Sequence, residues 1–331
     1  MKKRFLAMLL TGTMAAAMLA GCGSESADSA ASTAAGEETT EAEASTEDAA
    51  DSGDTTDIQP TDASSDAIEK KILRVGIECT YAPYNWTQES EELANGEKAV
   101  PIANSEGYAY GYDVALAQKI CDQLGWDLEI YKSDWTSIFM GLEDKTYDCI
   151  MSGVCYSEER DAIYDFSSTY YLRQIKAVVR EDSEWANITG LSQFDGTNPK
   201  VIAQLGTNFV PYKDQVPSGV SETDYEAASE LFLAIQNKTA DVLITEKSTA
   251  DSAFKTMTGL VQLDLDADDN FVEPEGSSNT CCILFRGDDS LRDIVQGAMD
   301  DMGWTDQTEE GVQAMNDLMT EAIDLQPSAA E

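Results

Sequence analysis

Residues 112–131, YDVALAQKICDQLGWDLEIY, contain a helix followed directly by a strand, and this unit decides the class of the fold. Apolar side chains recur at helical spacing as far as Leu124, which predicts a helix over 112–124. Gly125 follows as a C-cap, because glycine readily adopts the left-handed conformation that ends many helices. Residues 128–131 then predict a short strand. Helices that alternate with strands are typical of α/β proteins.

The same alternation continues on both sides of this unit, which predicts an α/β fold with mainly parallel strand pairing. Strands are expected at 73–77, 147–151, 175–180, 200–203, 240–244 and 281–285, and helices at 137–142, 225–237, 291–302 and 311–325. Residues 88–110 lack this alternation and are expected to be a surface loop near the rim of a cleft, either decorative or acting as a lid.

Composition excludes several functions. The chain has 331 residues, which is enough for two domains. Its 62 acidic and 21 basic residues give a net charge of −41, and this charge repels nucleic acid and anionic lipid headgroups. The sequence contains no histidine, which excludes a Ser-His-Asp triad and a His-ligated zinc site. We expect no metal and no cofactor.

The N-terminus carries an export signal. Three basic residues at 2–4 precede an apolar stretch at 5–20 that is too short for a spanning helix. The ending Leu19-Ala20-Gly21-Cys22 resembles a bacterial lipoprotein signal. The resemblance implies cleavage of residues 1–21 and diacylation of Cys22, hence attachment to the outer face of the cell membrane. An ordinary cleaved signal and a membrane anchor are the alternatives.

Residues 22–69 read as a disordered acidic linker. They are mostly small or polar, with 14 acidic and no basic residues. Such a composition buries too little apolar surface to fold, and its like charges extend the chain. We expect a tether, with the folded part beginning near Lys71.

Four blocks of sequence together resemble the family 3 extracellular solute-binding proteins, which are the polar amino acid receptors of ABC importers. In chain order the blocks are LRVGIECTYAPY at 73–84, GYDVALA at 111–117, YDCIMSG with SEER and DFS between 147 and 167, and QLGTN with ADVLI between 204 and 244. The block at 147–167 is the most specific.

The resemblance implies a two-lobed, periplasmic-binding-protein-like fold of type II, with two crossover hinge strands. Lobe 1 would comprise 71–172 and 280–331, and lobe 2 would comprise 173–279. It further implies a monomer that captures an amino acid by lobe closure and delivers it to a membrane permease.

A free amino acid presents a carboxylate, an ammonium and a side chain, and each needs a complementary group. The family motif places its carboxylate-binding arginine at Arg160; without the motif, Arg160 reads as a surface residue in a charge cluster. Ser152 and Gly153, at the turn after a strand, would complete the carboxylate pocket, or serve only as turn residues. Cys155 stands where the family usually has Ser or Thr, and it is a weaker donor.

The second lobe would supply the remaining polar groups. Thr207 matches a family position that binds the carboxylate, although an ordinary helix N-cap has the same appearance. Glu246 matches the family's acidic residue for the ammonium, and its alternative is a solvated charge beside Lys247.

Two aromatic residues match positions that flank the ligand's side chain. These are Tyr81 and Trp135, which without the resemblance read as core residues. Glu78 matches a position that is acidic in receptors for basic amino acids and in some others.

Six cysteines remain after Cys22, and no C-x-x-C pairs suggest zinc. One or two disulfides and buried free thiols are both open. We expect no enzymatic activity. A dehydratase acting on prephenate-like substrates with the same fold, and a ligand sensor, are the alternative functions.

Overall fold

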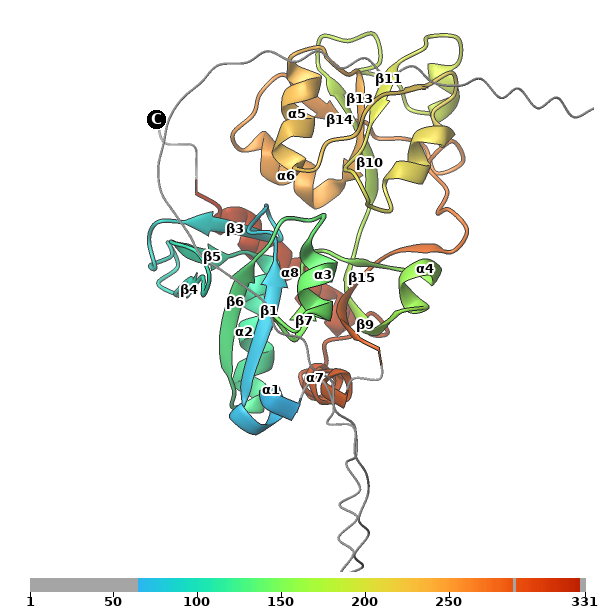
Figure 1. Ribbon diagram of the computed structural model, residues 1–331. Coiled ribbons are helices and arrows are strands. Elements are labelled where there is room, and N and C mark those ends of the chain that lie inside the picture. The colour runs from blue at the N-terminus through green and yellow to red at the C-terminus, as the bar shows by residue number, and fades with distance from the viewer. Residues whose placement is uncertain (1–64, 288–289, 328–331) are drawn as a thin grey trace, which may run out of the picture. The chain divides into compact units, whose positions relative to one another are not determined.

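The computed structural model describes residues 65–287 and 290–327, so the predicted signal, Cys22 and the linker up to residue 64 lie outside the described residues. The first of its sheets has the strand order β6-β1-β7-β15-β8, with β9 also paired to β15 (Figure 1). Its strands are β1 (Ile72–Ile77), β6 (Asp127–Lys132), β7 (Cys149–Ile150), β8 (Cys155–Ser157), β9 (Tyr164–Leu172) and β15 (Ser277–Arg286).

Helices cover both faces of this sheet because each face carries its own set of apolar side chains. One face packs against helices that include α2, which ends at Gly125 in the left-handed conformation, as predicted. The other face packs against α3 through a cluster that includes Ile138 and Leu142. The helices of this part are α1 (Ser65–Lys70), α2 (Tyr112–Leu124), α3 (Ile138–Glu143), α4 (Glu158–Asp161), α7 (Ser290–Asp301) and α8 (Glu309–Leu325).

A second sheet has the order β12-β11-β13-β10-β14 and is also covered on both faces. Its strands are β10 (Ile175–Arg180), β11 (Lys200–Ile202), β12 (Val220–Ser221), β13 (Val242–Glu246) and β14 (Leu260–Gln262), and its helices are α5 (Ala228–Gln236) and α6 (Lys247–Phe254). Short 3-10 helices lie at Leu191–Phe194 and Val210–Gln215.

The chain passes between the two large sheets twice. It leaves the first sheet at the end of β9 and enters the second with β10, with only residues 173–174 between them. It returns after β14 and enters the first sheet again with β15. Residues at these crossings therefore lie next to both sheets.

Strand pairing is more mixed than the sequence suggested. Parallel pairs join β1 to β6 and β7, and β11 to β12 and β13. Within the described residues, strands β9, β10, β14 and β15 pair with their neighbours only in antiparallel fashion. The prediction of mainly parallel pairing was wrong because the crossing strands run back along each sheet, a consequence of connectivity that local periodicity does not report.

Most of the expected surface loop at 88–110 lies outside strands and is exposed, but parts of it join a small antiparallel sheet, β2-β3-β5-β4. Its strands are β2 (Thr80–Tyr81), β3 (Asn85–Gln88), β4 (Val100–Pro101) and β5 (Tyr108–Tyr110). Leu93, Ala99 and Ile102 are buried beneath it. These strands are too short to show a two-residue period, and periodicity therefore could not predict them.

Residues 65–70, most of which the sequence analysis assigned to the linker before Lys71, form helix α1. Ala67 is buried against the first sheet, and Lys70 pairs with Asp66 at 3.0 Å one helical turn away. Within the described ranges, no helix has the length and apolar character needed to cross a membrane.

Candidate functional site

A small cavity lies where loops from both large sheets meet. Three of these loops directly follow β1, β7 and β11, and ligands of α/β proteins commonly bind beyond the carboxyl ends of the strands. Nine residues line it: Glu78, Tyr81, Trp135, Ser152, Gly153, Arg173, Gln204, Thr207 and Phe209. Six of these were predicted site residues, and the structure brings those six together.

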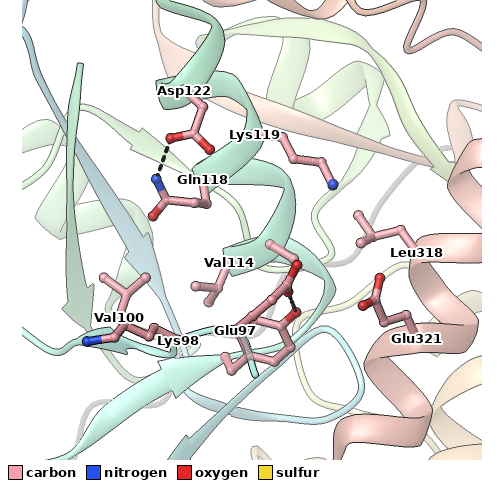
Figure 2. Close-up of a pocket in the computed structure, with 11 residues that line it drawn as sticks. Glu97, Lys98, Val100, Val114, Gln118, Lys119, Asp122, Leu318 and Glu321 are labelled. Carbon is pink, nitrogen blue, oxygen red and sulfur yellow. Dashed lines mark hydrogen bonds between the residues drawn. The ribbon is translucent and has the colours of Figure 1, made fainter. Parts of the chain in front are cut away.

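A larger hollow lies elsewhere, between the 88–110 region, α2 and α8 (Figure 2). Its wall carries charged side chains of both signs, and two of its polar groups are bonded within it, Gln118 to Asp122 and Tyr110 to Glu97. It draws on the first sheet's side of the molecule alone. We therefore take the smaller cavity, which both sheets build, as the candidate site.

The floor of the cavity is a buried polar cluster. The Ser152 hydroxyl accepts hydrogen bonds from the Glu78 backbone N–H at 3.2 Å and from Asn85 Nδ2 at 3.4 Å. The Glu78 side chain is buried, and burial, together with repulsion from nearby carboxylates, raises its pKa to about 8. The cavity therefore contains a carboxyl group that is largely protonated at neutral pH.

Gly153 has to be glycine at this turn. Its φ is +60°, and a Cβ atom there would come within 2.9 Å of the Tyr81 ring and 3.2 Å of Arg173 Nη2. Its N–H donates to the Tyr170 hydroxyl at 3.0 Å. The turn therefore lets the side chains of Tyr81 and Arg173 approach the backbone. The N–H of Gly153 is already bonded within the protein.

The two predicted aromatic residues are both buried at the cavity. Tyr81 is 3% exposed and stacks on Tyr84 with ring centroids 5.0 Å apart. Among the described residues, its buried hydroxyl finds no hydrogen-bond partner. Such an orphaned hydroxyl is costly unless another molecule satisfies it. Trp135 is 5% exposed, and the Arg160 guanidinium lies 5.7 Å from its ring centroid.

Arg160 lies beside the cavity rather than among its lining residues. Its Nη1 donates to the Cys155 carbonyl at 2.9 Å, and its Nη2 donates to the Gly206 carbonyl at 3.2 Å. Gly206 follows β11, so this guanidinium joins the two sides of the molecule. Burial lowers the pKa of Arg160, which a guanidinium tolerates without losing its charge.

Thr207 lines the cavity, but its hydroxyl is engaged locally. It donates to the Gln204 carbonyl at 2.7 Å and accepts from the Phe209 N–H at 3.3 Å. The expected helix after it is only a short 3-10 turn beginning at Val210. The loop is thus held in shape by its own hydrogen bonds.

Glu246 does not line the cavity in this structure. It is fully buried at the end of β13, and its carboxylate caps α6 by accepting from the N–H groups of Ser248 at 2.9 Å and Thr249 at 2.6 Å. The Thr249 hydroxyl donates to it as well. The visible role of Glu246 is therefore that of an N-cap.

Cys155 also lies behind the cavity wall. Its Sγ is 3.5 Å from Cys281 Sγ, across the pairing of β8 with β15. All six cysteines in the described ranges are free and buried. Of the two possibilities left open by the sequence, disulfides and buried free thiols, the structure shows free thiols. No group of ligands in these ranges could hold a metal ion.

Three lining residues were missed by the sequence analysis: Arg173, Gln204 and Phe209. Gln204 belongs to a block that carried the resemblance, but it was given no role. Arg173 stands alone between two strands, and periodicity cannot flag it. The one feature that could have indicated a role for Arg173 was its position at the predicted crossing between the lobes, because the crossings border the cleft.

Two α/β units joined by two crossings, with a cavity between their strand ends, define a type II periplasmic-type binding protein. The chain matches the family model of bacterial extracellular solute-binding proteins, family 3, over residues 73–311, and it belongs to that family.

The chain is similar to several known proteins. The chain is 27% identical over 237 residues to the arginine-binding extracellular protein ArtP of Bacillus subtilis, covering 70% of this chain and 81% of ArtP. Cyclohexadienyl dehydratase of Pseudomonas aeruginosa is 29% identical over 139 residues, 42% of this chain and 46% of the enzyme. The crystal structure of an amino acid ABC transporter substrate-binding protein from Streptococcus pneumoniae, bound to L-arginine, superposes with a TM-score of 0.63 at 21% identity, covering 80% of this chain and 99% of that one.

Proposed function

We propose that this protein captures a free amino acid for an ABC importer. The observation that carries the proposal is the cavity itself, to which both sheets contribute polar and aromatic side chains. A small cavity with a few convergent polar groups suits a small polar ligand. The amino-acid-binding relatives support the same ligand class.

Capture would proceed by closure of the two sides onto the ligand. Ser152, Gly153, Tyr81 and Trp135 come from the first side, whereas Thr207 comes from the second. A ligand that contacts both sets stabilises the closed arrangement, because the open arrangement can satisfy only one set. A permease then recognises the closed form.

Arg160 and Glu246 keep their proposed roles toward the carboxylate and the ammonium. Arg160 Nη2 already reaches the Gly206 carbonyl, and a ligand carboxylate would replace this acceptor with a charged one. Glu246 would have to bind the ammonium with whatever capacity its capping bonds leave, since a carboxylate has about four acceptor positions.

The direct test is a thermal-shift screen of the twenty amino acids on the full chain carrying Cys22→Ser. A ligand at 100 times its Kd should stabilise the protein by about 2.7 kcal/mol. Arg160→Met should remove that shift while the unliganded variant stays folded. Absence of any shift with all twenty amino acids would end the proposal.

A dehydratase is the second candidate. Glu78 favours it, because a buried carboxyl with a pKa of about 8 lining the cavity is suited to acid–base chemistry, and one relative is such an enzyme. Incubation with a cyclohexadienyl acid, followed by its absorbance, distinguishes the two: turnover supports the enzyme, and binding without turnover supports the receptor.

Lipid attachment at Cys22, an extracytoplasmic location at the cell membrane and a monomeric state complete the proposal. They rest on the signal sequence and the family. Membrane fractionation of wild type and Cys22→Ser in a bacterial host tests the anchor, since the wild type should sediment with membranes and the variant should not.

A further inference from the structure

Arg173 is the one positively charged residue among the nine that line the cavity. It lies between β9 and β10, at the first crossing between the two sheets. Its guanidinium contacts Gly153 and Cys281 on one side of the molecule and Asn208 and Phe209 on the other. An anion at this position would therefore interact with the part of the chain that links both sheets.

Every acceptor of the Arg173 guanidinium found among the described residues is neutral. Nη1 donates to the Asn208 amide oxygen at 3.2 Å, Nε donates to Cys281 Sγ at 3.1 Å, and Nη2 donates to the Gly153 carbonyl. Its planar group also lies over the Phe209 ring, 4.8 Å from the centroid. These contacts hold the fork in place without neutralising its charge.

Arg173 is partly buried, and the buried cations of the described residues are paired differently. Lys213 contacts Asp224 at 2.6 Å, and Arg286 lies 3.8 Å from the Asp148 carboxylate. Arg74, which is partly buried, also pairs with Asp148, at 2.6 Å. Burying a charge without a counter-charge is unfavourable, so proteins nearly always supply one. Arg173 forms no ion pair with a carboxylate of the described residues; the acidic groups that act on it through space include the Cys155 thiol and the buried Asp113.

The acid in the same cavity does not fill this role. Burial and neighbouring carboxylates raise the pKa of Glu78 to about 8, and no ion pair joins its carboxyl to Arg173 among the described residues. Arg160, the second guanidinium near the cavity, likewise has backbone carbonyls as its acceptors. The site therefore presents two guanidinium groups whose described acceptors are uncharged.

An amino acid with a single carboxylate would neutralise only one of them. Resting on the proposed function, we infer that the ligand carries a second anionic group, as acidic amino acids do, and that Arg173 binds it. The side-chain carboxylate of such a ligand would form a two-pronged, charge-assisted pair with the Arg173 fork. The protein should then prefer an acidic side chain to an amide side chain, because only the acidic one carries the negative charge that pairs with Arg173.

The test compares L-glutamate, L-aspartate, L-glutamine and L-arginine by calorimetric titration of the full chain carrying Cys22→Ser. At least one acidic amino acid should bind ten times or more tightly than glutamine, which has nearly the same shape as glutamate without its charge. Tighter binding of glutamine or arginine than of both acidic amino acids would overturn the inference and leave amino acid capture intact. Binding of none of the twenty amino acids would overturn both.

Two variants assign the effect to Arg173. Arg173→Met should weaken binding of the acidic ligand at least thirtyfold and of glutamine less than threefold. Arg160→Met is the matched control, because it should weaken glutamate and glutamine alike through their shared α-carboxylate. Equal losses for both ligands in Arg173→Met would contradict the inference. If Arg173→Met does not fold, Arg173→Lys, which keeps the charge but not the fork, should retain the acidic preference at reduced affinity, and loss of preference there counts against it.

Discussion

At the scale of single residues, the buried acids set the chemistry of the cavity. Glu78 and Asp113 are both buried, and burial is the main cause that raises the pKa of each. Asp113 is satisfied by Asn85 Nδ2 and the Tyr170 hydroxyl, each at 2.8 Å. Among the described residues, the Glu78 carboxyl has no such hydrogen-bond partner, and Glu78 lines the cavity. The protonation state of Glu78 should therefore respond to a bound ligand and to pH.

The raised pKa of Glu78 predicts how the stability of the protein depends on pH. Its pKa rises from 4.5 to about 8 on folding, so the folded state binds more protons than the unfolded state between these values. Stability should therefore fall as pH rises from about 5 to 8, with a slope of up to about 1.4 kcal/mol per pH unit from this group. Urea unfolding at several pH values measures the slope.

Glu78→Gln should flatten that slope, whereas Asp268→Asn, which removes an exposed carboxylate, should not. Asp113 contributes to the pH slope in the same direction in both variants. The difference between their slopes therefore gives the contribution of Glu78 alone. An unchanged slope in Glu78→Gln would show that the carboxyl is ionised in the folded protein.

At the scale of elements, α6 depends on the last residue of β13. Glu246 supplies the acceptors for the first N–H groups of the helix, in the manner of an N-cap. Glu246→Ala should lower the free energy of unfolding by about 1–2 kcal/mol, measured by urea unfolding without ligand. Thr308→Ala, which removes the cap of α8 at Gly311, should have a similar effect on stability.

The two cap variants then separate the roles of Glu246. Thr308→Ala should leave amino acid affinity unchanged, because α8 does not line the cavity. Glu246→Ala should also lose affinity if the carboxylate binds the ammonium as proposed. Full affinity in Glu246→Ala would reduce Glu246 to a structural cap.

At the scale of the whole molecule, a few polar contacts join elements of the two large sheets. The Thr136 hydroxyl, near α3, donates to Glu226 Oε1 at 2.7 Å, just before α5. Tyr171 and Ser248 hydroxyls lie 2.6 Å apart, and Lys255 contacts Asp324 at 2.9 Å. If the two sides close on a ligand as proposed, contacts of this kind bias the balance between closed and open forms without touching the ligand.

Glu226→Ala should therefore weaken amino acid binding about fivefold, which corresponds to about 1 kcal/mol for one hydrogen bond. The unliganded variant should also have a larger radius of gyration by small-angle X-ray scattering. Glu230→Ala, an exposed position on α5, is the control and should change neither quantity. A tighter-binding Glu226→Ala variant would mean that this contact opposes closure.

The sequence alone determined the local elements and the family. Helix α2 with its Gly125 cap, strand β1 and the block at 147–167 follow from periodicity and short motifs, which depend only on neighbours along the chain. Six lining residues of the cavity were predicted from their match to family positions, and the structure brings them together.

Only the tertiary structure decided which guanidinium lines the cavity and what Glu246 does. Arg173 enters the cavity because two distant loops and a crossing converge on it, and no local pattern encodes that convergence. The small sheet around 88–110 and the antiparallel return strands depend on connectivity in the same way. A charge acquires its partners from packing, and packing brings together residues far apart in the chain.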